Sequence, residues 1–437
     1  MTTRALIVSA PCSGAGKTSV SIGLMRAFAR KGLRVQGIKS GPDFIDPGFH
    51  KAATNRSGLN LDSWAMEHDL LHHFMHHVAQ ECDLLVIEGA MGLFDGIPAG
   101  DNRTGSVADI ARILNIPVLL VLDVSGQAQT AAAVAKGFEL FDPDVTIAGV
   151  LLNRVASERH RTLIETAMRK AETPFAGAVM RNSVPVLSER YLGLVQASEY
   201  EALEKFIEQL ADVMEASLDL DTVLSLAAPI NIPSASGDKA LPPPGQRIAL
   251  AQDAAFTFVY PHILDHWYRQ GSEIVSFSPL ADEIPPKDCD ICWLPGGYPE
   301  LYAGALSAAQ RFREGVSAFA KTKPVHGECG GYMVLGQYLE DAEGCTYEMT
   351  GLLAHGTSLK KRRMNLGYRK ARLLQSHVLG NNGDVIRGHE FHYATVMATG
   401  NNLPLVEMTD GLDNSLGEAG SRDGFVSGTF FHAIARS

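Results

Sequence analysis

The chain has 437 residues, enough for about two or three folded units, and 46% of its residues are hydrophobic while 20% are charged. This balance is typical of folded domains and argues against wholesale disorder. The formal net charge of -11 argues against nucleic acid as a partner, because such binding depends on clustered cations. No apolar run approaches ~20 residues and no leader pattern is found, so we expect a cytoplasmic protein without a membrane partner.

Apolar strand-like runs alternate with helical stretches up to about residue 180. Several runs consist almost entirely of Val, Ile and Leu, as expected for strands buried on both faces of a parallel sheet. The pattern predicts a doubly wound α/β domain whose ligands lie at the carboxyl ends of the strands. The predicted strands cover residues 5–9, 34–39, 84–87, 117–123, 147–153 and 174–179.

A change of composition predicts an interdomain linker. After a helical stretch at residues 199–216, prolines and small polar residues dominate as far as Gly245, and the strand and helix alternation restarts at Arg247. The sequence therefore predicts a first domain at residues 1–225, a linker at residues 226–246 and a second α/β domain at residues 247–437.

A phosphate-binding loop follows the first predicted strand. Backbone N–H groups, a cation and a hydroxyl are what phosphate and its metal require, and a strand, loop and helix supply them in that order. The strict Walker pattern has glycine at position 11, where this chain has Pro11, but the context still favours a nucleotide site. The loop residues are Ser13, Gly14, Ala15, Gly16, Lys17 and Thr18.

Carboxylates follow the second and third predicted strands. Asp43 and Asp46 lie in one segment, and Glu88 and Asp95 in the other. Carboxylate oxygens suit Mg²⁺, so we expect Thr18, Asp43 and Glu88 to hold it, although a turn-capping role is equally open for each aspartate. Asn153, at the end of another strand, is predicted either to contact the adenine or to stabilise a turn.

The segment Gly327-Glu328-Cys329-Gly330-Gly331 follows a short strand and predicts a nucleophile on a sharp strand-to-helix turn. A cysteine nucleophile requires a base, and His432 is favoured because such a base is usually distant in sequence. His326, His389 and His392 are the rivals. The amides of Gly297 and Gly330 are the candidate donors to an oxyanion.

These segments together resemble cobyrinate and hydrogenobyrinate a,c-diamide synthases, the glutamine-dependent amidases of corrin biosynthesis. The resemblance spans essentially the whole chain. Besides the phosphate loop and the cysteine segment, it rests on residues 39–47, 88–96 and 387–393.

The resemblance implies a dethiobiotin-synthetase-like ATPase followed by a triad-type glutamine amidotransferase. In such amidotransferases a glutamate commonly lies two residues after the histidine, where this chain has Ile434, so a Cys329–His432 dyad is expected. Glutamine would release ammonia at Cys329, while ATP and Mg²⁺ would convert carboxylates of the tetrapyrrole into acyl phosphates. The expected substrate contacts are Asp43, Asp46, Asp95, Gly297, Arg387, Glu390 and His392.

Several alternatives stay open at this point. A sibling amidase such as cobyric acid synthase or nickel-sirohydrochlorin a,c-diamide synthase is the alternative function, although residues 42–47 and 387–393 favour a,c-diamide synthesis, and a homodimer is possible. A partitioning-type switch ATPase is disfavoured, because Cys12 stands where such proteins carry a signalling lysine.

The basic residues 360–363, with Arg369 and Lys370, are either a contact for a polyanionic ligand or a solvated loop. The histidines within residues 68–77 are predicted to form a partly exposed helix face rather than a metal site.

Overall fold

The computed structural model describes residues 2–100, 102–185, 202–398 and 400–437. It divides into two compact units, Met1–Asp238 and Lys239–Ser437. This division falls within the predicted linker.

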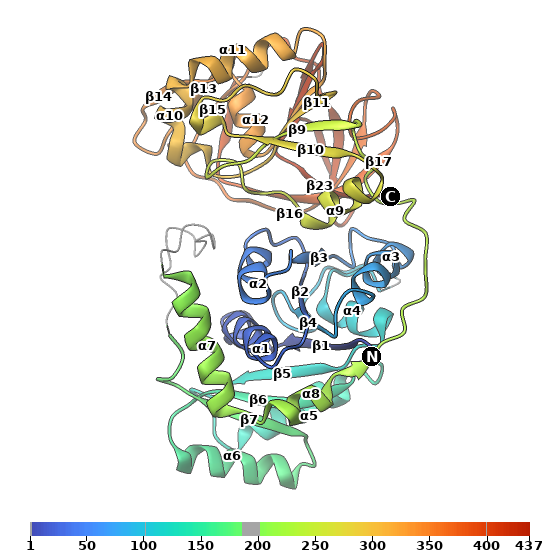
Figure 1. The fold of residues 1–437 in the computed structure, drawn as a ribbon, viewed down its shortest axis with the longest axis vertical. Coiled ribbons are helices and arrows are strands. Elements are labelled where there is room, and N and C mark those ends of the chain that lie inside the picture. Colours follow the sequence, from blue (N-terminus) through green and yellow to red (C-terminus); the bar gives the residue numbers. More distant parts are fainter. Residues whose placement is uncertain (1, 101, 186–201, 399) are drawn as a thin grey trace. The chain divides into compact units, whose positions relative to one another are not determined.

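The first unit is built on an eight-stranded sheet in the order β3-β2-β4-β1-β5-β6-β7, with β8 paired to β1 (Figure 1). All neighbours are parallel except β8, which runs antiparallel to β1. Every residue of β2 and β4 is buried, because helices cover both faces of the sheet. The strands are β1 (Arg4–Ser9), β2 (Val35–Ser40), β3 (Leu59–Leu61), β4 (Leu84–Glu88), β5 (Val118–Asp123), β6 (Ile147–Val155), β7 (Phe175–Met180) and β8 (Ala228–Pro229).

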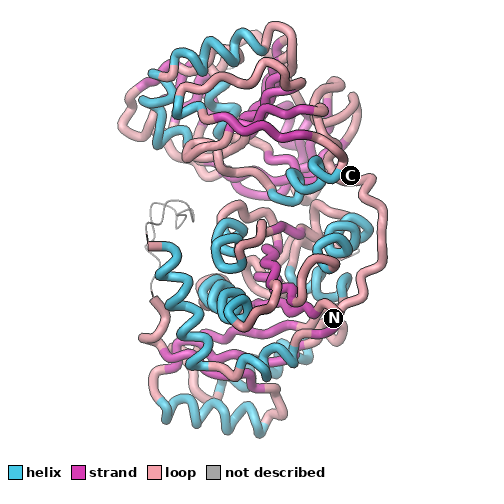
Figure 2. The backbone as a smooth tube through the Cα atoms, viewed as in Figure 1, coloured by secondary structure: helices cyan, strands magenta, loops and turns pink. Residues whose placement is uncertain are grey.

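Helices and strands alternate along this unit except at α7 and α8, which are consecutive, and Figure 2 shows the two kinds of element in separate colours. Side-chain caps begin three of them: Ser106 accepts from the N–H of Asp109, Ser157 from that of His160, and Asp219 from that of Asp221. The helices are α1 (Lys17–Arg30), α2 (Asp46–Thr54), α3 (His68–Ala79), α4 (Val107–Leu114), α5 (Thr130–Phe141), α6 (Glu158–Lys170), α7 (Leu203–Ser217) and α8 (Leu220–Leu226).

The six predicted strands of the first unit are confirmed to within about two residues at each end. The helix predicted at residues 199–216 corresponds to α7, although residues 199–201 lie outside the described part of the chain. Two strands, β3 and β8, were not predicted, since each has three residues or fewer. Because β8 belongs to the first sheet, the beginning of the predicted linker is part of this unit.

The second unit combines one mainly parallel sheet with two smaller sheets. The first has the order β10-β9-β11-β12-β22-β21, in which only β21 is antiparallel to its neighbour. The others have the orders β14-β13-β15-β18 and β20-β19-β16-β17-β23. Its helical elements are α9 (Pro261–Arg269), η2 (Pro279–Ala281), η3 (Pro299–Tyr302), α10 (Ala303–Ala308), α11 (Gln310–Phe319) and α12 (Gly330–Leu335).

The strands of the second unit are β9 (Arg247–Ala251), β10 (Glu273–Phe277), β11 (Ile291–Leu294), β12 (Val325–Glu328), β13 (Tyr338–Glu340), β14 (Thr346–Glu348), β15 (Gly356–Ser358), β16 (Asn365–Leu373), β17 (Val385–His392), β18 (Thr395–Ala398), β19 (Val406–Asp410), β20 (Ser415–Ala419), β21 (Ser421–Asp423), β22 (Val426–Thr429) and β23 (His432–Arg436). Among the described residues of the whole chain, no helix has both the length and the apolar character that crossing a membrane requires.

Close packing of α1 against α7 provides a test of the first unit's core (Figure 1). A Cβ on Gly23 would lie 2.8 Å from the carbonyl oxygen of Leu210 and 2.7 Å from Cγ of Met214. We predict that Gly23→Ala lowers stability by about 1–3 kcal/mol, because the helices must separate. Calorimetric unfolding would show a shift of the first unit's midpoint by several degrees, roughly 2–4 °C per kcal/mol.

Gly137→Ala in α5 is the matched control, since a Cβ there has open space around it. We expect no loss of stability for this variant, and a gain of up to about 1 kcal/mol from helix propensity. Equal midpoints for both variants would contradict the packing argument.

Candidate active sites in the two units

The predicted phosphate loop connects β1 to α1 in the first unit. Gly14 and Gly16 have φ angles of 78° and 92°, a region that glycine enters without strain. The helix begins at Lys17 with no side-chain cap at Gly16, so the N–H groups of its first turn face the loop. Lys17 Nζ donates to the carbonyl of Cys12 at 3.0 Å, and burial together with the Lys39 charge lowers the pKa of Lys17. The loop has the backbone donors and the cation that a phosphate requires.

Asn153 supports this loop from the end of β6. Its Nδ2 donates to the carbonyl of Ala15 at 2.8 Å, and a Cβ on Gly16 would lie only 2.3 Å from the same Nδ2. Its Oδ1 accepts from the N–H of Arg154 at 2.9 Å. These contacts are those of a residue that stabilises a turn, and contact with an adenine stays a prediction.

Glu88, at the end of β4, is the centre of a buried network. Its carboxylate accepts from Thr18 Oγ1 at 2.6 Å and from Lys39 Nζ at 2.9 Å, and lies 2.8 Å from His50 Nε2. Burial alone would raise the pKa of Glu88, but the Lys39 ammonium and the hydrogen bonds from His50 and Thr18 hold it below its ordinary value. Glu88 is therefore an ionised carboxylate next to the phosphate loop.

The predicted aspartates lie around the same network. Lys39 also forms an ion pair with Asp46 and lies 4.0 Å from Asp43, so one ammonium faces three carboxylates. Burial, together with the charges of Asp43 and Glu88, raises the pKa of Asp46. Asp43 also accepts from the N–H groups of Ile45 and Asp46, which is the turn-capping role left open by the sequence. One ammonium therefore compensates three carboxylates, Asp43, Asp46 and Glu88. Because the pKa of Asp46 is raised, one of these carboxylates can hold a proton.

Asp95 lies beside the phosphate loop. Its Oδ2 accepts from the N–H of Gly92 at 2.8 Å, and a Cβ on Gly92 would lie 2.5 Å from the carbonyl oxygen of Pro11. Burial lowers the pKa of Lys17, and the negative charge of Asp95 partly opposes this effect. The structure therefore brings Asp43, Asp46, Glu88 and Asp95 together with the loop.

The oxygen donors of this site fit a magnesium ion that also binds phosphate. Thr18 Oγ1 and Glu88 are adjacent, and Mg²⁺ characteristically takes one or two carboxylates and completes its shell with phosphate oxygens and water. In the described part of the chain, no three His, Cys, Asp or Glu side chains form a complete metal site. The donors therefore suit a metal that arrives with a nucleotide.

Cys329 occupies the predicted strand-to-helix turn of the second unit, between β12 and α12. Its φ of 48° and ψ of -107° form a strained conformation, held by its N–H donating to the carbonyl of Thr429 at 2.8 Å. A Cβ on Gly331 would lie 1.9 Å from the carbonyl oxygen of Leu294, so this position requires glycine. The predicted nucleophile turn is present.

His432 and Cys329 both lie against Gly296. A Cβ on Gly296 would lie 2.5 Å from Cε1 of His432 and 3.2 Å from Cβ of Cys329. Burial, with smaller effects from His389 and His392, lowers the pKa of His432 to about 3. The imidazole is therefore neutral at physiological pH, as a general base must be.

The rival histidines have other contacts. His326 Nδ1 lies 2.9 Å from Oγ of Ser427, and its ring packs on Trp293. His389 lies opposite His432 in the ladder of β17 and β23. The ring of His392 stacks on Phe430 with centroids 3.8 Å apart, and its Nδ1 lies 3.0 Å from the carbonyl oxygen of Ala394. This geometry favours His432 as the base.

The Cys329 thiol is neutral in the unliganded site. Burial raises its pKa, and the carboxyl groups of Glu300, Glu328 and Glu390 add to this effect. A neutral thiol beside a neutral imidazole means that proton transfer must accompany attack on a substrate.

The glycine turn at Gly296 and Gly297 lies next to the cysteine turn. A Cβ on Gly330 would lie 3.0 Å from the backbone nitrogen of Gly297, so the two predicted oxyanion donors are close together. Donation to an oxyanion by Gly297 stays a prediction.

The residues predicted on β17 separate into two groups. Glu390 acts electrostatically on Cys329 and pairs with Arg369 at 2.6 Å, where both side chains are largely buried. Arg387 instead donates to Oγ of Ser437 at 3.2 Å. Glu390 thus lies near the thiol, and a substrate contact by either residue stays a prediction.

Sequence reasoning missed the roles of Lys39 and His50. Lys39 lies on the predicted second strand, and a lysine within a fully buried strand was the available signal, because an ammonium is rarely buried without anionic partners. Nothing in the local sequence of His50 distinguishes it, since its partner Glu88 is far away in the chain.

The His-rich face of α3 holds the end of the first unit. His73 Nδ1 lies 3.1 Å from the carbonyl of Ala235, and His76 Nδ1 lies 2.8 Å from that of Ile232. The opposite face of the helix is buried through Leu70, Leu71, Phe74, Met75 and Val78. The prediction of a helix face rather than a metal site agrees with these contacts.

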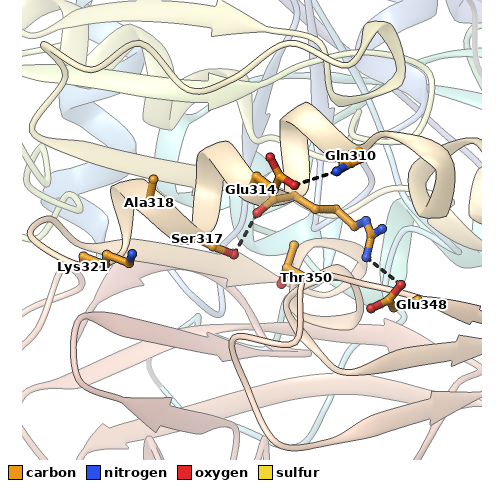
Figure 3. A pocket seen from close by; sticks show the side chains of 8 residues that line it. Gln310, Glu314, Ser317, Ala318, Lys321, Glu348 and Thr350 are labelled. Atoms are coloured by element: carbon orange, nitrogen blue, oxygen red, sulfur yellow. Dashed lines mark hydrogen bonds and ion pairs between the residues drawn. The ribbon is translucent and has the colours of Figure 1, made fainter.

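Every residue of the basic segment 360–363 is exposed, while Lys370 pairs with Asp413 at 2.5 Å. A separate hollow of about 520 Å³ lies over α11 and β14 (Figure 3). Its Arg313 is paired with Glu348 at 3.0 Å, and none of the predicted site residues lines it. The hollow therefore belongs to neither site.

Comparison with known proteins identifies the domain family of each unit. A family model described as the CobQ/CobB/MinD/ParA nucleotide binding domain matches residues 6–192, and one described as the CobB/CobQ-like glutamine amidotransferase domain matches residues 247–437. These matches confirm the predicted fold classes of both units.

Similarity to known relatives extends over the full length. The chain is 62% identical over 436 residues to a hydrogenobyrinate a,c-diamide synthase of Agrobacterium fabrum, and 60% identical over 438 residues to that of Mesorhizobium japonicum, with 100% of each chain covered. The synthase of Rhodobacter capsulatus is 50% identical, with 99% of both chains covered.

The Lys39 network gives a pH-dependent test. In the native protein the lowered pKa of Glu88 contributes stability above the ordinary glutamate pKa, and this contribution is lost as the pH falls. In Lys39→Met, burial and mutual repulsion would instead raise the carboxylate pKa values, so destabilisation would grow as the pH rises. We predict a loss of about 3 kcal/mol at about pH 8 and a smaller loss at about pH 5.

Calorimetric unfolding at both pH values measures this difference. Lys31→Met removes the exposed ion pair with Asp221 and is the control, for which less than about 1 kcal/mol is expected at either pH. A loss for Lys39→Met that does not depend on pH would contradict the charge-sharing account.

Proposed function

Because the chain belongs to the hydrogenobyrinate a,c-diamide synthase family, we propose that it amidates the a and c side-chain carboxylates of hydrogenobyrinate. Glutamine is the nitrogen donor and ATP the activating co-substrate, so the protein is a carbon–nitrogen ligase. The observation that carries this function is the presence, in one chain, of a phosphate loop beside a carboxylate network and a thiol beside a neutral imidazole.

The second unit supplies the nitrogen. Cys329 Sγ attacks the side-chain amide carbon of glutamine while His432 takes the thiol proton, and the amides of Gly297 and Gly330 are the proposed donors to the resulting oxyanion. His432 then returns the proton to the leaving nitrogen, which departs as ammonia. Water, deprotonated by His432, hydrolyses the thioester and releases glutamate.

The first unit activates the acid. The loop amides and Lys17 bind the phosphates of ATP, and Thr18, Asp43 and Glu88 are the proposed ligands of Mg²⁺, which would neutralise charge on the transferring phosphoryl group. A carboxylate oxygen of the substrate attacks the γ-phosphorus, giving an acyl phosphate and ADP. Ammonia then attacks the acyl carbon, phosphate leaves, and an amide remains.

Substrate contacts are proposed for the predicted residues that surround these groups. Asp43, Asp46 and Asp95 lie beside the phosphate loop, and Glu390 lies near the thiol. His392, stacked on Phe430, is proposed as part of the glutamine pocket wall, because it lies near enough to His432 to contribute to the lowering of that residue's pKa. Arg387, whose Nε donates to Oγ of Ser437, stays a predicted contact for the substrate.

The relatives distinguish among the alternatives left open by the sequence. These relatives are hydrogenobyrinate a,c-diamide synthases, which favours this acid over cobyrinate and over the substrates of the sibling amidases. A partitioning ATPase is ruled out as an account of the whole chain, because residues 247–437 form an amidotransferase domain. A homodimer and a cytoplasmic location stay predictions.

The function is tested by incubating the purified protein with ATP, Mg²⁺ and glutamine and one tetrapyrrole acid at a time. We expect hydrogenobyrinate to lose mass in two steps, because each amidation replaces OH by NH₂, and expect cobyrinate, hydrogenobyrinate a,c-diamide and nickel-sirohydrochlorin to react far more slowly. Faster amidation of any of these three would overturn the choice of substrate.

Separate chemistry at the two sites makes Cys329→Ala informative. We predict that this variant loses glutamine-dependent amidation by a factor of about 10³ or more, because no thioester forms, and retains amidation with added ammonium salt. Product masses and ammonia release would be measured for both nitrogen sources.

Lys17→Ala is the reciprocal control. It should lose amidation with either nitrogen source, because the phosphates lose their cation, while glutamine hydrolysis continues. Loss of ammonia-dependent amidation in Cys329→Ala would contradict the separation of the sites.

A further inference from the structure

The residue before the nucleophile, Glu328, is a buried carboxylate with no part in the mechanism described so far. It ends β12, and only 6% of its surface is exposed. Its Oε2 lies 3.9 Å from Nδ1 of His432, and its Oε1 accepts from the N–H of Ala433 at 3.2 Å. One carboxylate oxygen is therefore anchored to the backbone of β23, and the other faces the imidazole.

The hydrogen bond from Ala433 to Glu328 lies next to the position at which triad amidotransferases commonly carry a glutamate. The position two residues after His432 is Ile434, which is 2% exposed and apolar. Glu328 reaches the backbone of Ala433, the residue between His432 and Ile434, although it comes from another sheet. A carboxylate therefore reaches this part of β23 by a different route.

We propose that Glu328 is the positioning residue of the thiol site, where its Oε2 accepts a hydrogen bond from Nδ1–H of His432 once glutamine is bound. Nε2 of His432 then carries no proton and is free to accept one from the Cys329 thiol. The proposal rests on the glutaminase activity proposed above and adds a third group to the Cys329–His432 dyad.

The distance of 3.9 Å is compatible with this role, because catalytic hydrogen bonds are often long in unliganded sites and shorten in the substrate complex. When the thiol proton moves to Nε2, the imidazole becomes a cation, and the carboxylate stabilises that charge. Glu328 forms no covalent bond and keeps no proton at the end of the cycle. It acts only through His432.

The protonation state of Glu328 decides which imidazole tautomer is present. Burial raises the pKa of Glu328 to about 8, against a smaller lowering by the Ala433 N–H. Below that pH its OH donates to Nδ1, which leaves the proton on Nε2 and prevents the imidazole from acting as a base. Glutaminase activity should therefore rise as the pH rises through about 8.

Four other titratable groups influence the pKa of His432 or of Cys329. His389 and His392 face His432, and burial lowers the pKa of each to about 4, so both are neutral near pH 8. Glu300 and Glu390 act on Cys329 together with Glu328. Burial raises the pKa of Glu300 to about 7, close to that of Glu328. An experiment must therefore distinguish the effect of Glu300 on the pH profile from that of Glu328.

Glu328→Gln in the full chain is the test. The glutamine oxygen would still accept from Ala433, and its NH₂ group would face Nδ1 and select the unproductive tautomer. We expect kcat for glutamine hydrolysis to fall by about 10²–10⁴-fold with little change in KM. Ammonia-dependent amidation should persist, and the rise in activity near pH 8 should disappear.

Glu300→Gln is the matched control, because it neutralises another carboxylate near the thiol while leaving Glu328 in place. Its pH profile should keep the rise near pH 8, whatever its absolute rate. A Glu328→Gln protein with wild-type kcat and pH profile would overturn the proposal. Absence of glutaminase activity in the unmodified protein would instead overturn the proposed function.

A measurement on the unmodified protein covers the case in which Glu328→Gln does not fold. ¹⁵N spectra of histidine-labelled protein, with His432 assigned through His432→Gln, report which ring nitrogen carries the proton. We expect the Nδ1–H tautomer above about pH 8 and the Nε2–H tautomer below it. A tautomer that stays unchanged across this range would contradict the proposal.

Discussion

Both sites depend on strand-to-helix turns that require glycine at a particular position. In the first unit, Gly16 has a φ of 92°, which other residues rarely adopt, and in the second, a Cβ on Gly331 would lie 1.9 Å from the carbonyl oxygen of Leu294. These turns bring the start of each helix against a neighbouring strand. The backbone N–H groups of the turn and the reacting side chains then meet at the carboxyl ends of parallel strands.

The electrostatic surroundings of the two turns are opposite, and the difference follows from the chemistry. Beside the phosphate loop, Lys39 and Glu88 are charged and buried together, which suits a site that binds a polyanion and its metal. Around Cys329, burial favours the neutral thiol and the neutral His432. Charge separation there is delayed until a substrate arrives, so the thiol is protected from adventitious reactions.

The sequence predicted the features that are local and missed those that are not. The parallel strands were predictable because each is a continuous apolar run, and both turns were predictable because their glycines have fixed offsets from Lys17 and Cys329. The small sheets of the second unit were not, because a strand such as β20 is exposed along most of its length and has no alternation to detect. The partners of Glu88 and His432 were also missed. Glu88 meets His50 across 38 positions, and Glu328, which faces His432, is bound to Ala433 across 105 positions, separations that no local pattern records.

The position of Glu328, directly before the nucleophile in the chain, determines which groups of the thiol site move together. Glu328 and Cys329 are consecutive, so a displacement of the β12 turn moves the nucleophile and the proposed positioning group together relative to the imidazole. A carboxylate two residues after the histidine would instead move with the base. Because Oε1 of Glu328 is held by the N–H of Ala433, the hydrogen bond ties the end of β12 to β23, two strands that belong to different sheets. The distance between nucleophile and base is then fixed by one short connection rather than by the packing of whole sheets, which is the kind of support that a preorganised site requires.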